Sequence, residues 1–125
     1  SGGFKEVTIM ANKKALELLK NEDVDAFNKW VKERRKKGKD SIDLDDQNLG
    51  GLKLKGIDLR DARLNGSNLR KSDLRDANLK SARLRQADLR GANLQCADLA
   101  SADLRKAKMK GANLKKATLK DARGL

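Results

Sequence analysis

Apolar residues return at every fifth position through most of the chain. The residue two places before each of them is small or apolar in every unit except the one with Gln47. A period of five matches neither the 3.6-residue repeat of a helix nor the two-residue repeat of a strand. We therefore predict units of two or three extended residues followed by a corner, with both apolar positions facing inward. The predicted core positions are Leu44, Leu49, Leu54, Leu59, Leu64, Leu69, Leu74, Leu79, Leu84, Leu89, Leu94, Leu99, Leu104, Met109, Leu114 and Leu119.

The residue two places after each core position should form the corner. Glycine stands at several of these corners, and glycine readily adopts the positive φ that a type II turn requires. Lys71, Asp76 and Gln86 take the same place in other units, so we expect a second turn type there. The glycine corners are Gly51, Gly56, Gly66, Gly91 and Gly111.

Before residue 40 the spacing of apolar residues becomes helical. Phe27, Trp30 and Val31 lie three and four positions apart, which is typical of one helix face. The pattern predicts a hairpin of helices over about 11–20 and 24–36. We expect its apolar side chains to pack over the first coil of the repeat; they are Leu16, Leu19, Val24, Phe27, Trp30 and Val31.

The ends of these helices carry their own signals. "NED" at 21–23 offers Asn and Asp as N-caps for the second helix, and Gly38 is a suitable residue to end it. Upstream, "FKEVTI" at 4–9 fits a short extended segment.

The repeat itself resembles a known family. "ADLRGANLQCADL" at 87–99 follows the motif A(D/N)LXX of the pentapeptide-repeat family, and the resemblance covers about 42–123. "LLKNEDVDAFNKWVKE" at 18–33 is similar to a leader found ahead of many bacterial pentapeptide repeats. Phe27 stands where that leader commonly has Trp, and Val31 where it commonly has Arg.

This resemblance implies an all-β solenoid: a right-handed quadrilateral β-helix with four units in each coil. Sixteen units then make about four coils, preceded by an N-terminal α-helical hairpin cap. The expected organisation is a cloning remnant and short extended segment at 1–10, the cap at 11–40, and the β-helix at 41–125. The starting Ser-Gly-Gly suggests the remnant.

Composition offers little for catalysis. The chain has no His, which removes the commonest general base and transition-metal ligand. "DLDD" at 43–46 fits a solvated acidic corner better than a cation site, and Cys96 falls at an outward corner without a base nearby. We therefore predict no catalytic residue, no metal and no cofactor. A single Cys allows no internal disulfide and suits a cytoplasmic location; no apolar run is long enough to cross a membrane.

The charge pattern is more informative. The chain carries a net charge of +12, and residues 41–125 hold 19 basic and 11 acidic side chains. Residues twenty apart should stack, which gives two candidate columns for anion binding: Arg70, Arg90 and Lys110 on one, Arg85 and Arg105 on the other. The alternative interpretation of both columns is solubility and protection from edge pairing.

These features predict a non-enzymatic protein-interaction or scaffold module of unidentified partner. The alternative is a basic module that binds an anionic partner: nucleic acid without sequence specificity, an acidic protein or a membrane surface. Residues 41–125 contain no aromatic side chain to stack on bases. Some family members protect DNA gyrase by imitating DNA, but that imitation needs a negative rod, so the positive charge argues against it.

The oligomeric state follows from the same charges. The last coil is rich in lysine, and lysine on an exposed edge opposes pairing with another chain. We therefore favour a monomer, with a C-terminal end-to-end dimer as the alternative. These lysines are Lys106, Lys108, Lys110, Lys115, Lys116 and Lys120.

Overall fold

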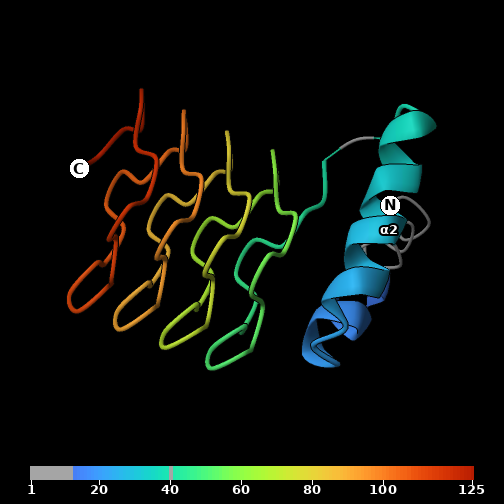
Figure 1. The fold of residues 1–125 in the computed structure, drawn as a ribbon, viewed down its shortest axis with the longest axis horizontal. Coiled ribbons are helices and arrows are strands. Elements are labelled where there is room, and N and C mark those ends of the chain that lie inside the picture. Colours follow the sequence, from blue (N-terminus) through green and yellow to red (C-terminus); the bar gives the residue numbers. More distant parts are fainter. Residues whose placement is uncertain (1–12, 40) are drawn as a thin grey trace, which may run out of the picture.

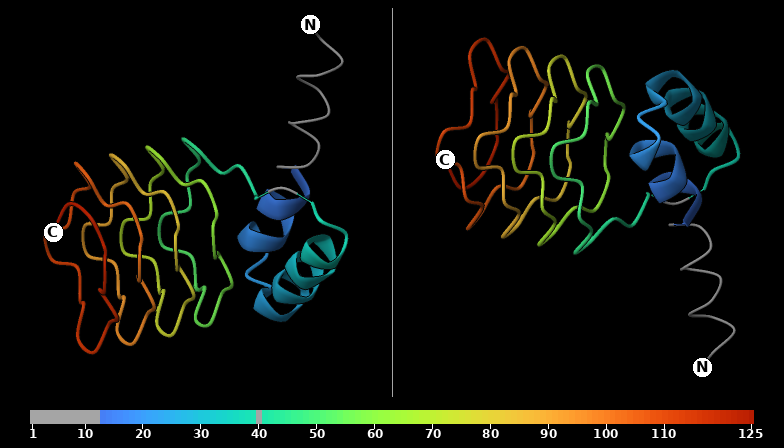
Figure 2. Two further views of the ribbon diagram at one scale, coloured as in Figure 1. Left: turned by 90° about the horizontal axis from the view of Figure 1, so that it is seen from above. Right: turned by 90° about the horizontal axis from the view of Figure 1, so that it is seen from below.

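Each five-residue unit forms one side of a coil, and four units complete a turn. The structure, a computed structural model, describes residues 13–39 and 41–125. Parallel bridges join residues twenty apart, from Asp43 with Arg63 to Asp103 with Arg123. The sixteen units therefore stack as four coils, with the helical segments at one end of the stack (Figures 1 and 2).

The sides are too short to form continuous strands. In the described residues every bridge between coils involves a single residue on each coil. The N–H of Leu64 donates to the carbonyl of Arg83 at 2.7 Å, and the N–H of Arg83 donates back to Ala62 at 2.9 Å. The predicted β-solenoid is thus built from single bridges, because a corner interrupts each side after two or three residues.

The inward positions make one continuous core. The centres from Leu44 to Leu104 are all buried, and so are most residues two places before them. Ser67 and Ser72 are buried in place of Ala, and each hydroxyl donates to a backbone carbonyl at 2.7 Å. Their polarity is therefore satisfied inside the rod.

The last coil departs from the predicted core. Met109 and Leu114 are only partly buried, and Leu119 is 37% exposed. These residues point into the rod like the other centres, but in this structure no further coil stacks on them. These side chains are therefore covered only by the preceding coil.

All corners share one conformation, so the expectation of a second turn type was wrong. Lys71, Asp76 and Gln86 have φ values of 56°, 58° and 61°, close to the 70° of Gly51. The N–H of Ala77 donates to the carbonyl of Leu74 at 3.1 Å and closes the turn around Asp76. Positive φ at the third residue is the signature of a type II turn. Stacking imposes this turn even where the residue is not glycine.

The shared corner predicts that Gln86→Gly stabilises the protein. A non-glycine residue in the left-handed region costs about 1–2 kcal/mol, whereas the added backbone freedom of glycine costs about 0.5–1 kcal/mol. We expect the melting temperature to rise by a few degrees. Gly51→Ala is the reverse control, because a Cβ there meets no atom within 4 Å and introduces backbone strain alone. A lower melting temperature for Gln86→Gly would contradict this account.

Two helical segments cover the first coil. Residues 13–20 are helical, and α2 spans Val24–Lys36. Asp23 caps α2 by accepting the N–H of Ala26 at 3.1 Å. At the other end Gly38 has a φ of 66°, and the N–H of Lys39 donates to Arg34, as in a Schellman motif. Residues 1–12, including the segment expected to be extended, lie outside the described residues.

The cap joins its apolar face to the core of the rod. Leu19, Phe27 and Val31 are buried. The other predicted cap residues are partly buried and pack against the same cluster; they are Leu16, Val24 and Trp30. The Phe27 and Trp30 rings lie 5.8 Å apart between centroids. No helix among the described residues has the length and apolarity needed to span a membrane.

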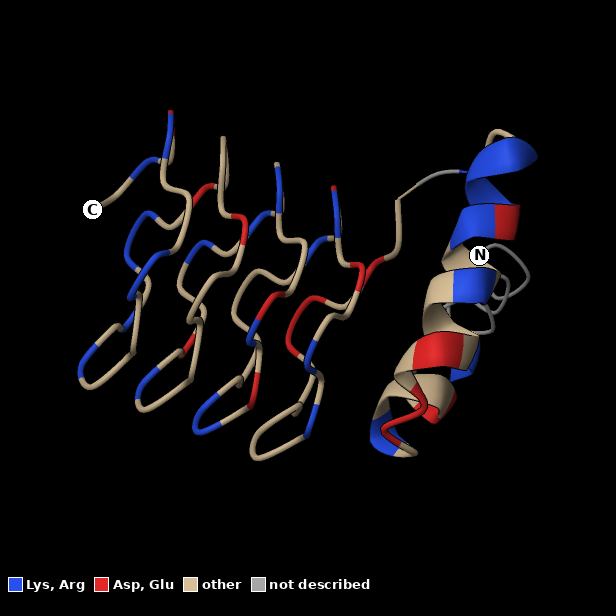
Figure 3. Ribbon diagram, in the orientation of Figure 1, with Lys and Arg blue, Asp and Glu red and all other residues tan. Residues whose placement is uncertain are grey.

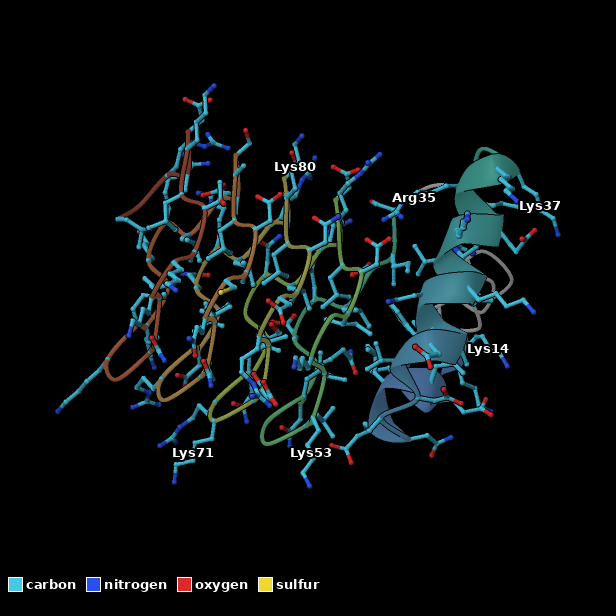
Figure 4. The ribbon with its side chains drawn as sticks, in the orientation of Figure 1. Lys14, Arg35, Lys37, Lys53, Lys71 and Lys80 are labelled. Carbon is cyan, nitrogen blue, oxygen red and sulfur yellow. The ribbon has the colours of Figure 1, made fainter. Side chains whose placement is uncertain are left out.

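Polar side chains of the cap also form hydrogen bonds with backbone groups at the edge of the first coil, where in the rest of the rod a neighbouring coil would bond them. The Asn28 amide donates to the carbonyl of Gly56 at 3.0 Å and accepts the N–H of Asp58 at 2.8 Å. The Glu22 carboxylate accepts the N–H of Lys53. Arg35 reaches from α2 to the first coil (Figure 4) and holds the Asp58 carboxylate at 2.6 and 3.0 Å. The cap therefore satisfies part of the edge that the first coil would otherwise expose.

Candidate interaction surfaces

Stacking turns the outward positions into columns along each side of the rod (Figure 3). The structure places the two predicted basic columns on different sides. Arg70, Arg90 and Lys110 lie on the side formed by units 47–51, 67–71, 87–91 and 107–111, here called the basic face. Arg85 and Arg105 lie on the side formed by units 42–46, 62–66, 82–86 and 102–106.

Several arginines are bound by the aspartate two residues before them. The Asp88 carboxylate accepts the Nε of Arg90 at 2.8 Å, its Nη2 at 2.6 Å and its backbone N–H at 3.2 Å. These hydrogen bonds lower the pKa of Asp88 to about 2. Asp73 and Arg75 form the same arrangement. In three of the four "DLR" triplets the arginine side chain is thus bound by the aspartate two residues before it; in the fourth, Asp58 binds Arg35 instead.

Asp103 is the centre of a larger cluster. Its carboxylate is buried, accepts two side-chain hydrogen bonds from Arg105, and lies 3.9 Å from Arg85 Nε and 3.5 Å from Arg123 Nη2. The hydrogen bonds from Arg105 hold the pKa of Asp103 far below its usual range. Both members of the second predicted column therefore face an internal anion.

The basic face keeps most of its cations unneutralised. Among the described residues, Arg70, Lys71, Lys108 and Lys110 are exposed and have no ion pair. The one acid on this side, Asp88, is bound to Arg90. Lys71 and Lys108 were not among the predicted anion-binding residues. Lys71 occupies a corner and Lys108 the place before a centre, whereas the predicted columns consist of residues in the place after a centre.

The side of the rod across from the basic face differs in charge. This opposite face comprises units 57–61, 77–81, 97–101 and 117–121, and it has three basic and four acidic residues, against five and one on the basic face. Lys71 and Lys80 project from opposite edges of the stack (Figure 4). These two sides therefore differ in net charge. The side formed by units 52–56, 72–76, 92–96 and 112–116 is also basic, with five basic and two acidic residues, so the basic face carries the largest net positive charge of the four sides.

A cavity of about 410 Å³ lies between the end of α2 and the first coil. Arg34, Arg35 and Arg60 line it over an apolar base that includes Val31. Arg35 is bound to Asp58, Arg60 lies 3.4 Å from Asp61, and Arg34 stacks on Trp30 at 5.1 Å. All three guanidinium groups are thus engaged, and the Arg35–Asp58 pair joins the cap to the rod.

Reactive groups do not converge in the described part of the chain. No three His, Cys, Asp or Glu side chains are arranged there to hold a metal ion. In the acidic corner, Asp45 accepts a hydrogen bond from Arg63 at 2.6 Å and from the N–H of Asn65 at 2.8 Å. Cys96 is exposed.

The lowered carboxylate pKa values predict acid-sensitive stability. Asp73, Asp88 and Asp103 have folded-state pKa values below the usual value of about 3.9. Between about pH 4 and pH 2 the unfolded chain should bind more protons than the folded one, so the free energy of unfolding should fall as the pH is lowered through this window. Urea melts at a series of pH values test this. Asp88→Asn should make the free energy of unfolding depend less on pH in this window. A free energy of unfolding that rises on acidification below pH 4 would contradict the prediction.

The comparisons with known proteins agree with this architecture. Residues 42–80 and 82–121 match the profile described as Pentapeptide repeats, with eight copies. Among solved structures, HetL from the cyanobacterium Nostoc sp. strain PCC 7120 is 43% identical with a TM-score of 0.63, over 64% of this chain and 37% of HetL. Rfr23 from the cyanobacterium Cyanothece 51142 is 38% identical with a TM-score of 0.62, over 67% of this chain and 60% of Rfr23.

The chain therefore spans less than two thirds of either structural relative. A comparison with curated protein sequences finds no significant match. The repeat match covers more than half of the chain, and the coils form the β-helix solenoid shared with these relatives. The protein belongs to the pentapeptide-repeat family.

Proposed function

We propose that the chain is a non-enzymatic protein-interaction or scaffold module whose binding surface is the charged exterior of the rod. The observation that supports this proposal is that the interior of the rod is filled with side chains while its outer sides differ in net charge. The centres from Leu44 to Leu104 are buried, so the repeat has no internal cleft for a substrate. Each side of the rod holds its outward side chains at regular spacings on a rigid backbone, which suits recognition of another protein surface.

One structural relative, HetL, supports a regulatory role. HetL is a pentapeptide repeat protein involved in the regulation of heterocyst differentiation. A role for this chain in regulation through contact with another protein is consistent with its similarity to HetL over the repeat region. The helical hairpin would then serve as the N-terminal cap of the module.

The alternative, a module that binds an anionic partner, is favoured by one observation: the unpaired cations of the basic face. Affinity for nucleic acid would fall steeply with salt, because it would rest on phosphate contacts. A pull-down from the source cell at low and raised salt separates the two functions. A defined protein that persists at raised salt supports the proposal, nucleic acid that leaves as salt rises supports the alternative, and turnover of a substrate would overturn both.

We further propose that the chain is a monomer at moderate salt. The lysines of the last coil are exposed, and an end-to-end dimer would bring them together. Leu119 and Leu125 are the exposed large hydrophobic side chains among residues 13–39 and 41–125, and they favour the alternative dimer. Light scattering at low and high salt decides between them, and a dimer that persists at both would show that apolar and backbone contacts outweigh the lysines.

A further inference from the structure

We propose that the basic face is a docking surface for an acidic protein surface. The inference rests on the proposed interaction function and adds the surface and the chemistry of the partner. The contact residues are Arg70, Lys71, Lys108 and Lys110, with Lys106 at the adjoining corner.

The first support is the availability of these cations. On the neighbouring side, Arg85, Arg105 and Arg123 surround the Asp103 carboxylate. On the basic face only Arg90 is engaged, and it holds both oxygens of Asp88. On this side an external carboxylate would therefore meet cations that form no ion pair among the described residues, whereas on the Asp103 side it would compete with a buried anion.

The second support is geometric. Neighbouring coils lie about 4.8 Å apart, and side chains two residues apart on one side are separated by about 6.6 Å. Lys108 and Lys110 follow the second spacing, and Arg70 and Lys110 lie two coils apart, at twice the first spacing, with the engaged Arg90 between them. Carboxylates on the face of a β-sheet occupy the same two spacings, so an acidic sheet can match several of these cations at once.

Other anionic partners fit this side less well. Single-stranded nucleic acid is bound through aromatic side chains on which bases stack, and residues 41–125 contain none. Membrane-surface segments insert apolar side chains, but the centres of the basic face up to Leu89 are buried. The exposed Leu119 belongs to the opposite face.

The test compares two variants of equal net charge. Lys108→Glu with Lys110→Glu alters the basic face, and Lys80→Glu with Lys120→Glu alters the opposite face. All four lysines are exposed and free of ion pairs among the described residues, so both variants should melt like the parent. The probe is a fluorescent peptide of alternating Glu and Thr, which places carboxylates on one side of an extended chain. Binding is followed by anisotropy at roughly 0.1 M salt, where distant exposed charges are screened.

We expect the basic-face variant to bind the peptide about tenfold more weakly than the parent, and the opposite-face variant less than twofold more weakly. Equal losses in both variants would show that net charge alone governs binding and would overturn the surface. Duplex DNA and phosphatidylserine vesicles serve as competing probes. If binding of the DNA or the vesicles is weakened by the basic-face substitutions and binding of the peptide is not, the proposed class of partner is wrong.

Both variants are then used in the pull-down from the source cell. If the parent and the opposite-face variant capture a protein that the basic-face variant does not, the inference is supported. A protein retained by both variants overturns the inference but leaves the proposed function standing. Absence of any defined protein with the parent chain overturns the proposed function itself.

Discussion

Replacing Leu89 with aspartate should leave the chain without a stable fold at 25 °C. Leu89 is fully buried in the third coil. Burying a leucine side chain contributes about 1.5–3 kcal/mol, and an unpaired carboxylate in its place adds several kcal/mol of desolvation. A loss of at least about 5 kcal/mol is comparable with the entire stability of a domain this size. Circular dichroism should show no cooperative melt.

A milder substitution and an outward control keep this result interpretable. Leu89→Ala should remain folded and lose about 2–5 kcal/mol. Lys80→Asp, at an exposed position, should change the stability by less than about 0.5 kcal/mol. Equal tolerance of aspartate at positions 89 and 80 would refute the assignment of inward and outward positions.

The periodicity was sufficient to predict which residues form the core. The five-residue register places Leu44 and Leu89 inside without any knowledge of the turn, because a repeat that closes every twenty residues must keep its apolar positions on the same side of the backbone. The four-unit coil implied by the family resemblance added the prediction that outward residues twenty apart would stack in columns. The register did not distinguish the last coil, where burial of Leu119 depends on what lies beyond it.

The turns and the charges were harder to infer. Glycine at some corners and Lys71 or Gln86 at others suggested two conformations, but the stacked backbone imposes one φ on all of them. The columns identified Arg85 and Arg105 as candidate anion sites, although a neighbouring aspartate neutralises them. The predicted columns followed only the place after each centre. They therefore left out Asp103, which lies two residues before Arg105 and twenty before Arg123 and pairs with both.

The hydrogen bonds of the cap carried no recognisable sequence signal. Asn28 stands on the polar side of a predicted helix, where an amide is usually solvated. In the structure it takes the place of a neighbouring coil by bonding both Gly56 and Asp58. This contact joins the cap to the first coil by hydrogen bonds as well as by apolar packing.

Phe27→Ala should destabilise the protein by about 3–5 kcal/mol, with the loss concentrated at the capped end. Phe27 is fully buried between α2 and the rod, and truncation of a buried phenylalanine leaves a large cavity. Poor docking of α2 should also weaken the Asn28 bond to the N–H of Asp58. In a solenoid each coil depends mainly on its neighbours, so the effect should decrease along the rod.

Amide hydrogen exchange measures this gradient. In the Phe27→Ala variant the N–H of Asp58 should exchange much faster than in the parent, whereas the N–H of Thr118, which donates to Ala97 at 2.9 Å, should change little below the melting temperature. Lys29→Ala on the exposed side of α2 is the matched control and should leave both rates unchanged. Unaltered exchange at Asp58 in the Phe27→Ala variant would show that the first coil is stable without its cap. Faster exchange of equal size at Asp58 and Thr118 would show instead that the rod and the cap unfold as a single unit.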